Sequence, residues 1–142
     1  MFDNKTIVLA GNPNVGKSVL FSRLSKVYAA ASNFPGTTVE LLEADFEQGR
    51  IIDSPGVYGV SDLSAEERVT RDVLFRGDYI VNVLDATHLE RDLFFTLQLI
   101  DMGLPLWLRS LCGGALNASL LIGSRDAPQS RRILPRVQTG IR

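Results

Sequence analysis

The chain has 142 residues, of which 45% are hydrophobic and 22% charged, the composition of one globular domain with a packed core. Its net charge of −1 gives no general affinity for nucleic acid. The lone cysteine, Cys112, excludes an internal disulfide and fits a reducing compartment. We see no signal peptide ahead of the first predicted strand, and no apolar run reaches the ~20 residues that span a membrane.

Charge is distributed unevenly along the chain. Residues 1–105 carry nine basic and fifteen acidic side chains, whereas residues 106–142 carry six arginines and one acid. The net charge therefore changes from −6 to +5, and a change this abrupt marks a boundary. We predict a core domain over residues 1–105 and an atypical, Arg-rich tail over residues 106–142.

The first predicted elements enclose a phosphate-binding motif. An apolar, β-branched run over residues 6–10 predicts a buried strand, and apolar positions after residue 18 predict a helix. The loop between them has the form G-x-x-x-x-G-K-S: Gly11, Asn12, Pro13, Asn14, Val15, Gly16, Lys17 and Ser18. Backbone N–H groups of such a loop, with the start of the next helix, cradle phosphate. Lys17 is predicted to reach the β- and γ-phosphates and Ser18 to hold Mg²⁺; the alternative, a glycine-rich turn without a ligand, fits this strand–loop–helix context less well.

A small, polar segment over residues 29–38 is predicted to be a loop because it contains a Pro-Gly pair. A hydroxyl in such a loop can complete the Mg²⁺ shell while a γ-phosphate is present and release it after hydrolysis. Thr37 and Thr38 are both candidates for this ligand. A half-exposed strand over residues 39–46 and a short antiparallel strand over residues 50–53 are predicted to follow.

A second motif, D-x-x-G, begins at the end of that short strand and runs from Asp53 to Gly56. In this context we expect Asp53 to hold a Mg²⁺-bound water and the Gly56 N–H to contact the γ-phosphate. The alternative is an Asp-x-Pro-Gly turn that only reverses the chain.

The rest of the core alternates helices with strands. Ser64 and Glu67 have capping-box spacing at the start of a predicted helix that ends near Gly77. A buried strand is predicted over residues 79–85, and the start of another over residues 104–108. This alternation predicts a mostly parallel sheet covered by helices on both faces, with ligands bound beyond the carboxyl ends of its strands.

A further helix is predicted over residues 89–101, with Gly103 stopping it. We expect Phe95 to belong to the core, together with the apolar face formed by Leu93, Phe94, Leu97 and Ile100. His88 precedes this helix and is interpreted as a surface or capping residue, since the sequence holds no second histidine for a metal site.

With these motifs in place, the chain from about residue 6 to residue 105 resembles the N-terminal GTPase domain of the ferrous iron transport protein B (FeoB) family. The most specific match is V-L-D-A-T-H-L-E-R-D-L over residues 83–93, followed by T-L-Q-L over residues 96–99 and G-L-P over residues 103–105. Residues 33–40 resemble the first switch region of that family. The resemblance implies an α/β P-loop NTPase fold of the Ras-like G-domain type, truncated on its C-terminal side.

The resemblance also implies roles for individual residues. Thr38 takes the position of the Mg²⁺-binding threonine, and K⁺ is expected beside the phosphates at Asn14, where it would supply positive charge. Val57 stands where many GTPases carry a water-orienting glutamine, so the group that orients water stays unassigned. The implied catalytic residues are Lys17, Thr38 and Gly56; the implied Mg²⁺ ligands are Ser18, Thr38 and Asp53; and the nucleotide contacts outside the P-loop are Asn33, Gly36, Thr37, Thr38, Asp53 and Gly56.

The function implied by the resemblance is a regulatory domain that binds and hydrolyses GTP at the cytoplasmic face of the inner (plasma) membrane. Its ligands would be GTP or GDP, Mg²⁺ and K⁺, and its partner the Fe²⁺ permease domain of the same or a longer chain, with an oligomer formed through the transporter. A soluble GTPase associated with ribosomes or RNA is one alternative, but it predicts a basic surface, which the acidic core does not favour. A non-catalytic, truncated remnant with weak phosphate binding is the other.

One expected feature is missing: no N-x-x-D motif, which would read guanine, follows Pro105. We hypothesise that the tail from Leu106 is translated out of frame or is disordered, since codons chosen for residues 106–111 and read in another frame encode Val-Val-Ala-Leu, as the family strand would. A native, divergent segment is the alternative. Guanine specificity and enzymatic activity are therefore left open by the sequence, and the missing strands predict an open sheet edge and an uncovered apolar face that favour association.

Overall fold

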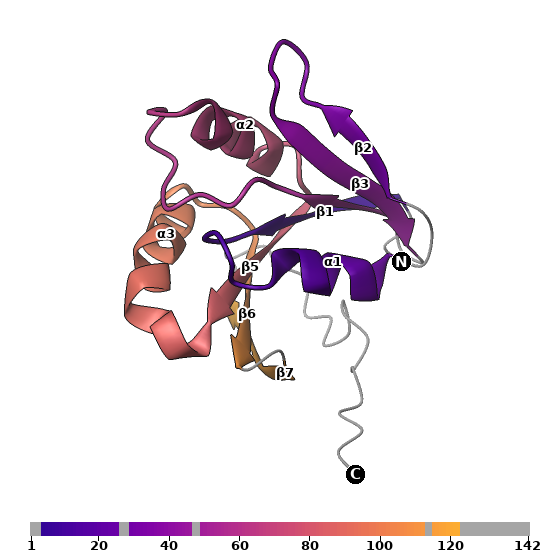
Figure 1. Ribbon diagram of the computed structural model, residues 1–142. Coiled ribbons are helices and arrows are strands. Elements are labelled where there is room, and N and C mark those ends of the chain that lie inside the picture. The colour runs from indigo at the N-terminus through magenta and orange to yellow at the C-terminus, as the bar shows by residue number, and fades with distance from the viewer. Residues whose placement is uncertain (1–3, 26–28, 47–48, 113–114, 123–142) are drawn as a thin grey trace.

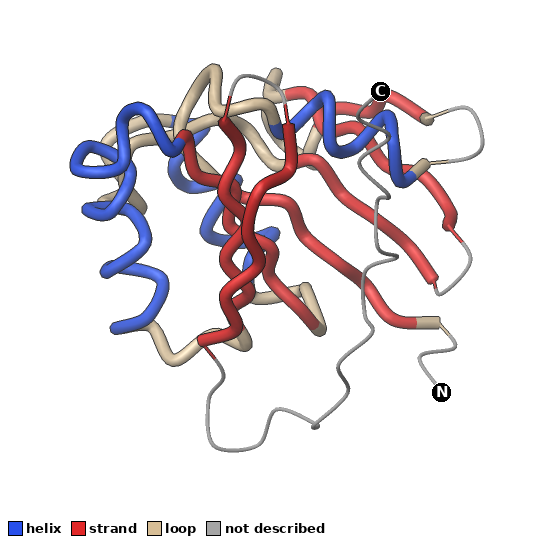
Figure 2. The backbone as a smooth tube through the Cα atoms, turned by 90° about the horizontal axis from the view of Figure 1, so that it is seen from below, coloured by secondary structure: helices blue, strands red, loops and turns tan. Residues whose placement is uncertain are grey.

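The computed structural model describes residues 4–25, 29–46, 49–112 and 115–122, which form one twisted sheet with helices on both sides (Figures 1 and 2). The strands are β1 (Lys5–Ala10), β2 (Ala30–Asn33), β3 (Glu40–Phe46), β4 (Gly49–Asp53), β5 (Tyr79–Asp85), β6 (Leu106–Cys112) and β7 (Ala115–Ile122). The helices are α1 (Lys17–Leu24), α2 (Ala65–Leu74) and α3 (Leu89–Asp101), with a short 3-10 turn, η1 (Ala86–His88), before α3. In the part of the chain that these ranges cover, no helix is long and apolar enough to cross a membrane.

The sheet has the strand order β2-β3-β4-β1-β5-β6-β7. Its centre is parallel, because β1 pairs in parallel with β4 and β5, and β5 pairs in parallel with β6. Both flanks are antiparallel: β3 pairs with β2 and β4, and β7 pairs with β6. The predicted α/β fold is confirmed, including the antiparallel approach of the strand that ends at Asp53. The sheet is mixed rather than mostly parallel, because three of its neighbouring strand pairs are parallel and three are antiparallel.

Strand periodicity divides the core between the two faces of the sheet. Successive side chains of β1 alternate, so that Ile7 and Leu9 pack with α1 while Val8 and Ala10 pack with α2 and α3. The α1 cluster contains Leu20 and Phe21; the cluster on the other face contains Val69, Val73, Leu74, Phe95 and Leu99. Helices therefore cover both faces, as the alternation of elements predicts (Figure 1).

The predicted loop over residues 29–38 is wrong for its first part. Residues 30–33 form β2, which pairs with β3 in antiparallel register from Ala30↔Glu43 to Asn33↔Glu40. All four residues of β2 are exposed, so no hydrophobic pattern marks the strand. Its backbone pairing with β3 decides the conformation, and the sequence of β2 alone does not reveal that partner.

The predicted inner face of α3 is also wrong. Phe94 and Leu97 are 63% and 62% exposed, whereas Phe95 is fully buried. The inner stripe of the helix consists of Asp92, Phe95, Thr96 and Leu99. Apolar residues occupy most of the helix circumference, so their spacing alone did not select a face, and two polar residues turn inward because they have buried hydrogen-bond partners.

The sheet continues beyond residue 105. β6 pairs with β5 from Ile80↔Leu106 to Asp85↔Leu111, and β7 folds back on β6 in antiparallel register. Residues 106–112 and 115–122 are thus described as strands, whereas residues 113–114 and 123–142 of the predicted tail lie outside the described residues. The boundary at residue 105 stays a prediction.

Candidate phosphate-binding site

The P-loop joins the carboxyl end of β1 to α1, at the edge of the sheet where ligands of such folds bind. Gly11 has φ +150°, and a Cβ at this position would lie 2.5 Å from the backbone oxygen of Val83, so only glycine lets the loop pass this close to β5. Asn14 adopts a left-handed φ of +62°, which asparagine tolerates better than most residues. Gly16 caps α1 without any side-chain hydrogen bond, so the first N–H groups of the helix stay free to bind an anion.

Lys17 and Asp53 form a buried pair of opposite charge beside this loop. Lys17 is 8% exposed, and its Nζ donates to the backbone oxygen of Gly11 at 3.3 Å. Burial lowers the pKa of Lys17, and the charge of Asp53 opposes that shift. Burial likewise raises the pKa of Asp53, with Lys17 and the hydroxyl of Ser18 opposing it. Each charge of the pair therefore counteracts the effect of burial on the pKa of the other.

Oxygen atoms suited to a hard cation lie next to this pair. Ser18 Oγ donates to Asp53 Oδ2 at 3.1 Å. Asp53 Oδ1 is buried and has no hydrogen-bond partner among the described residues. A hydroxyl and a carboxylate with an unpartnered oxygen fit Mg²⁺, which prefers oxygen ligands and retains several waters.

The D-x-x-G loop is tied to β1 and the P-loop by its own hydrogen bonds. Ser54 donates from its backbone N and its Oγ to the Leu9 oxygen, at 3.1 and 2.7 Å, and the Val57 N–H donates to the Gly11 oxygen at 3.4 Å. A Cβ at Gly56 would lie 2.8 Å from Pro13 Cα and 3.2 Å from the Nζ of the P-loop lysine. Only glycine therefore lets the second loop touch the first, as its proposed contact with the γ-phosphate requires.

These groups line one pocket of about 310 Å³. It brings together four predicted site residues, Lys17, Ser18, Asp53 and Gly56. The other lining residues are Glu40, Leu42, Ser54 and Pro55. Glu40 was not predicted to be a site residue. Its position two residues after Thr38, within the stretch that resembles the first switch region, is the sequence feature that could have indicated it.

The predicted switch residues lie outside this pocket. Thr38 is exposed, and the β2–β3 connection that carries it extends away from the P-loop (Figure 1). Thr37 closes a turn, since its Oγ1 donates to the Phe34 oxygen at 2.9 Å and accepts from Val39 N at 3.1 Å. Asn33 and Gly36 are also exposed and line no part of the pocket. The Thr38 hydroxyl thus stays a predicted Mg²⁺ ligand that must move to reach the site.

Sequence reasoning missed two side chains that hold the site from α3. Gln98 Oε1 accepts the Val60 N–H at 3.2 Å, which fixes the loop that follows Gly56. Asp92 accepts a hydrogen bond from Asn12 of the P-loop at 2.9 Å. Both belong to the segment whose resemblance to the family is most specific, but the sequence of that segment does not reveal what these side chains contact.

Val57 lies in the buried core, 5% exposed. Its side chain contributes to the packing of the core. The expectation that another group must orient the attacking water therefore stands as a prediction.

Comparisons with known proteins agree with this geometry. The sequence model of the family described as "Ferrous iron transport protein B" matches residues 5–111. The Fe(2+) transporter FeoB of Methanocaldococcus jannaschii is 45% identical over 103 residues, 68% of this chain and 15% of the relative. That of Helicobacter pylori strain 26695 is 46% identical over 102 residues, 68% of this chain and 16% of the relative. A crystal structure of a mutant S. thermophilus NFeoB bound to GDP has a TM-score of 0.69 and 42% identity, over 73% of this chain and 43% of that chain. The chain thus spans about one sixth of the length of the curated relatives that it matches.

Proposed function

Because this chain belongs to the ferrous iron transport protein B family, as an N-terminal G domain, we propose that its P-loop pocket binds GTP and GDP. One observation carries the proposal: Lys17, Ser18, Asp53 and Gly56 line one pocket, with the lysine and the aspartate both buried. The GDP-bound structure of the S. thermophilus relative supports the choice of a guanine nucleotide. Nothing in the fold or in the relatives favours the RNA-associated or the non-catalytic alternative.

The contacts of the P-loop and of the D-x-x-G loop support the following roles. The backbone N–H groups of the P-loop and of the first turn of α1 hold the α- and β-phosphates. Lys17 binds the β- and γ-phosphates, and the Gly56 N–H contacts the γ-phosphate. Ser18 and Asp53 hold Mg²⁺, which when bound would neutralise charge on the phosphate oxygens.

The loop between β2 and β3 would complete the site. We propose that Thr38 moves onto the bound metal when a γ-phosphate is present, with Asn33, Gly36 and Thr37 contacting the nucleotide. The exposed position of Thr38 and its lack of hydrogen bonds to described residues leave it free to move. An ordered loop with GTP and a released loop with GDP would be the signal that the domain sends.

A cation beside Asn14 is a further part of the proposal. Asn14 is exposed at the tip of the P-loop in a left-handed conformation. K⁺ held there by the side-chain oxygen would add positive charge next to the phosphates, the charge that an arginine supplies in other GTPases.

For the whole protein we propose regulation of Fe²⁺ transport. The curated relatives are Fe(2+) transporters, and this chain corresponds to about 15% of their length. The domain would act at the cytoplasmic face of the membrane on a permease domain that lies elsewhere in the same or a longer chain. The rate of GTP hydrolysis would then set how long the domain stays in its GTP-bound state and acts on the permease.

Calorimetric titration of the chain with GDP, GTP and ATP in the presence of Mg²⁺ tests this function. We expect GDP and GTP to bind at least tenfold more tightly than ATP. Equally weak binding of all three would contradict the proposal and favour the non-catalytic remnant.

The rate of GTP hydrolysis in K⁺ and in Na⁺ tests the role of Asn14 separately. We expect faster hydrolysis in K⁺, and the difference should disappear in the Asn14→Ala variant. Equal rates in the two salts for the unchanged chain would rule the K⁺ site out.

A further inference from the structure

A buried hydrogen bond joins the P-loop to α3 behind the phosphate pocket. Asn12 Nδ2 donates to Asp92 Oδ1 at 2.9 Å, and both residues are 1% exposed. The other carboxylate oxygen, Asp92 Oδ2, accepts the backbone N–H of Asp85 at 2.7 Å, at the end of β5. One carboxylate therefore connects three parts of the fold: the P-loop, the end of β5 and the first turns of α3.

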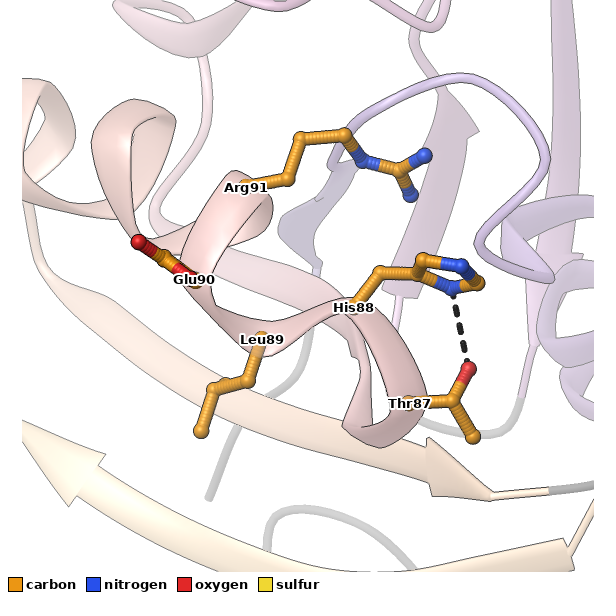
Figure 3. A pocket seen from close by; sticks show the side chains of 5 residues that line it. All are labelled: Thr87, His88, Leu89, Glu90 and Arg91. Atoms are coloured by element: carbon orange, nitrogen blue, oxygen red, sulfur yellow. Dashed lines mark hydrogen bonds between the residues drawn. The ribbon is translucent and has the colours of Figure 1, made fainter.

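The neighbouring side chain completes this arrangement. Arg91 Nε donates to Asp92 Oδ1 at 3.1 Å. Figure 3 shows Arg91 and His88 extending to the same side of the junction between η1 and α3, while Leu89 points away from them. The Asp92 carboxylate thus receives three donors on its two oxygens, which is what a buried charge needs to be tolerated.

The same network continues deeper into the sheet. The backbone oxygen of Asp92 accepts from Thr96 Oγ1 at 3.0 Å, and Thr96 Oγ1 accepts from Asn82 Nδ2 at 2.7 Å. Asn82 and Thr96 are 0% and 1% exposed, respectively. This network fixes α3 at two points on β5, the Asp85 N–H and the Asn82 side chain.

Stability alone does not explain an acid at this position. The inner stripe of a helix on a sheet normally takes apolar residues, and replacing a buried ion pair by packed hydrophobic groups is often neutral or stabilising. An apolar residue could accept neither from the Asp85 N–H nor from Asn12, and the second of these contacts reaches the P-loop. This asparagine follows Gly11, in the loop whose N–H groups must face the phosphates.

We propose that Asp92 is a positioning residue of the phosphate site: through Asn12 it fixes the P-loop against the end of β5 before nucleotide binds. A loop held in its binding conformation loses less entropy when phosphate arrives. The effect on nucleotide affinity rests on the proposed function, whereas the effect on the rigidity of the loop does not.

Exchanging the two side chains gives a direct test, because an amide and a carboxylate can trade places across the contact. In the Asn12→Asp variant two buried carboxylates face each other without the amide donor that joined the two residues. In the double variant Asn12→Asp/Asp92→Asn the new amide donates to the new carboxylate, while its oxygen accepts the Asp85 N–H. Arg91 loses its acceptor on residue 92 and turns to water, since its side chain is 44% exposed. The single variant Asp92→Asn should have only a mild effect on the P-loop. In the unchanged chain Asn12 Oδ1 is buried without a partner, so Asn12 can turn its amide and accept from the new asparagine with this oxygen.

The first measurement is hydrogen exchange of the P-loop amides of the full chain without nucleotide. We expect Asn12→Asp to speed exchange at residues 11–16 at least tenfold and the double variant to return within threefold of the unchanged chain. The control Asn4→Asp, which adds the same charge at an exposed position, should leave these amides unchanged. No acceleration in Asn12→Asp, or no recovery in the double variant, would overturn the proposal.

The second measurement is the affinity for GDP with Mg²⁺, which we expect to fall at least tenfold in Asn12→Asp and to recover in the double variant. If the single variant does not fold, recovery of folding and of slow exchange in the double variant supports the pair, and a double variant that also fails to fold contradicts it. If the unchanged chain binds no GDP, the proposed function fails while the exchange measurement still decides the role of Asp92.

Discussion

Gly56 is the residue at which the two loops of the site touch. Its backbone lies outside the left-handed region, so the obstacles to alanine there are the close contacts with Pro13 and with Lys17 Nζ. We predict that Gly56→Ala costs about 1–3 kcal/mol of stability through overpacking. The affinity for GTP should fall at least tenfold and more than that for GDP, because the Gly56 N–H is assigned to the γ-phosphate. Urea unfolding and calorimetry measure the two effects; equal losses for GTP and GDP would contradict the assignment.

Asp85 gives the junction between β5 and α3 a dependence on pH. Hydrogen bonds from Thr87 and His88 lower the pKa of its carboxyl to about 2, from a usual 3.8. Since the pKa is lower in the folded protein, the stabilisation is fully present well above pH 3.8 and is lost as the pH falls through about 2. We predict that Asp85→Asn shifts the urea midpoint by a constant amount above pH 5 and by progressively less toward pH 2. A shift of the same size at every pH would contradict this account.

At the scale of one element, α3 offers a matched pair of neighbouring phenylalanines. Phe95 is fully buried and Phe94 is 63% exposed. We predict that Phe95→Ala destabilises the chain by about 3–5 kcal/mol, the usual loss for a buried aromatic side chain. Phe94→Ala should change stability by less than about 0.5 kcal/mol, as exposed substitutions do. Denaturant unfolding of both variants measures the difference, and similar losses would show that the helix is rotated relative to this description.

The sequence predicts the bounds of an element better than the direction in which it faces, and α3 shows why. Its existence and its bounds follow from apolar periodicity and from Gly103, but its orientation depends on Asp92 and Thr96, whose partners are distant in the chain. β2 likewise depends on its pairing with β3 rather than on its own side chains. Patterns within an element report its type, whereas contacts between elements decide which way it faces.

The candidate site shows the same difference between local patterns and contacts from other elements. The P-loop residues are contiguous, and a motif of contiguous residues carries its local geometry with it, so the sequence could name Lys17 and Ser18, which both line the pocket. Asp53 and Gly56 were predicted because the D-x-x-G motif begins at the end of a short strand, which the structure shows as β4. Glu40 and Gln98 reach the site from other elements, and the proposed role of Thr38 depends on a bound nucleotide. A local sequence pattern does not show such relations.

The whole molecule carries an apolar surface on α3. Its exposed members are Leu89, Leu93, Phe94, Leu97 and Ile100. An apolar surface of this kind favours association. We predict that the chain self-associates as its concentration rises, and that Phe94→Lys combined with Leu97→Glu reduces association without changing the affinity for GDP. Sedimentation velocity over a range of concentrations measures this, and an unchanged chain that stays monomeric throughout would contradict the prediction.

The most direct test of the central claim, that the loop from Gly11 to Ser18 binds nucleotide phosphates, is calorimetric titration of the chain and of its Lys17→Ala variant with GDP and Mg²⁺. Among the described residues, Lys17 is the only cation that lines the pocket, so its removal takes away the proposed main partner of the β-phosphate. We predict saturable binding by the unchanged chain and a loss of affinity of at least a hundredfold in Lys17→Ala, about 2.7 kcal/mol. Equal affinity of the two proteins for GDP would show that the nucleotide binds elsewhere.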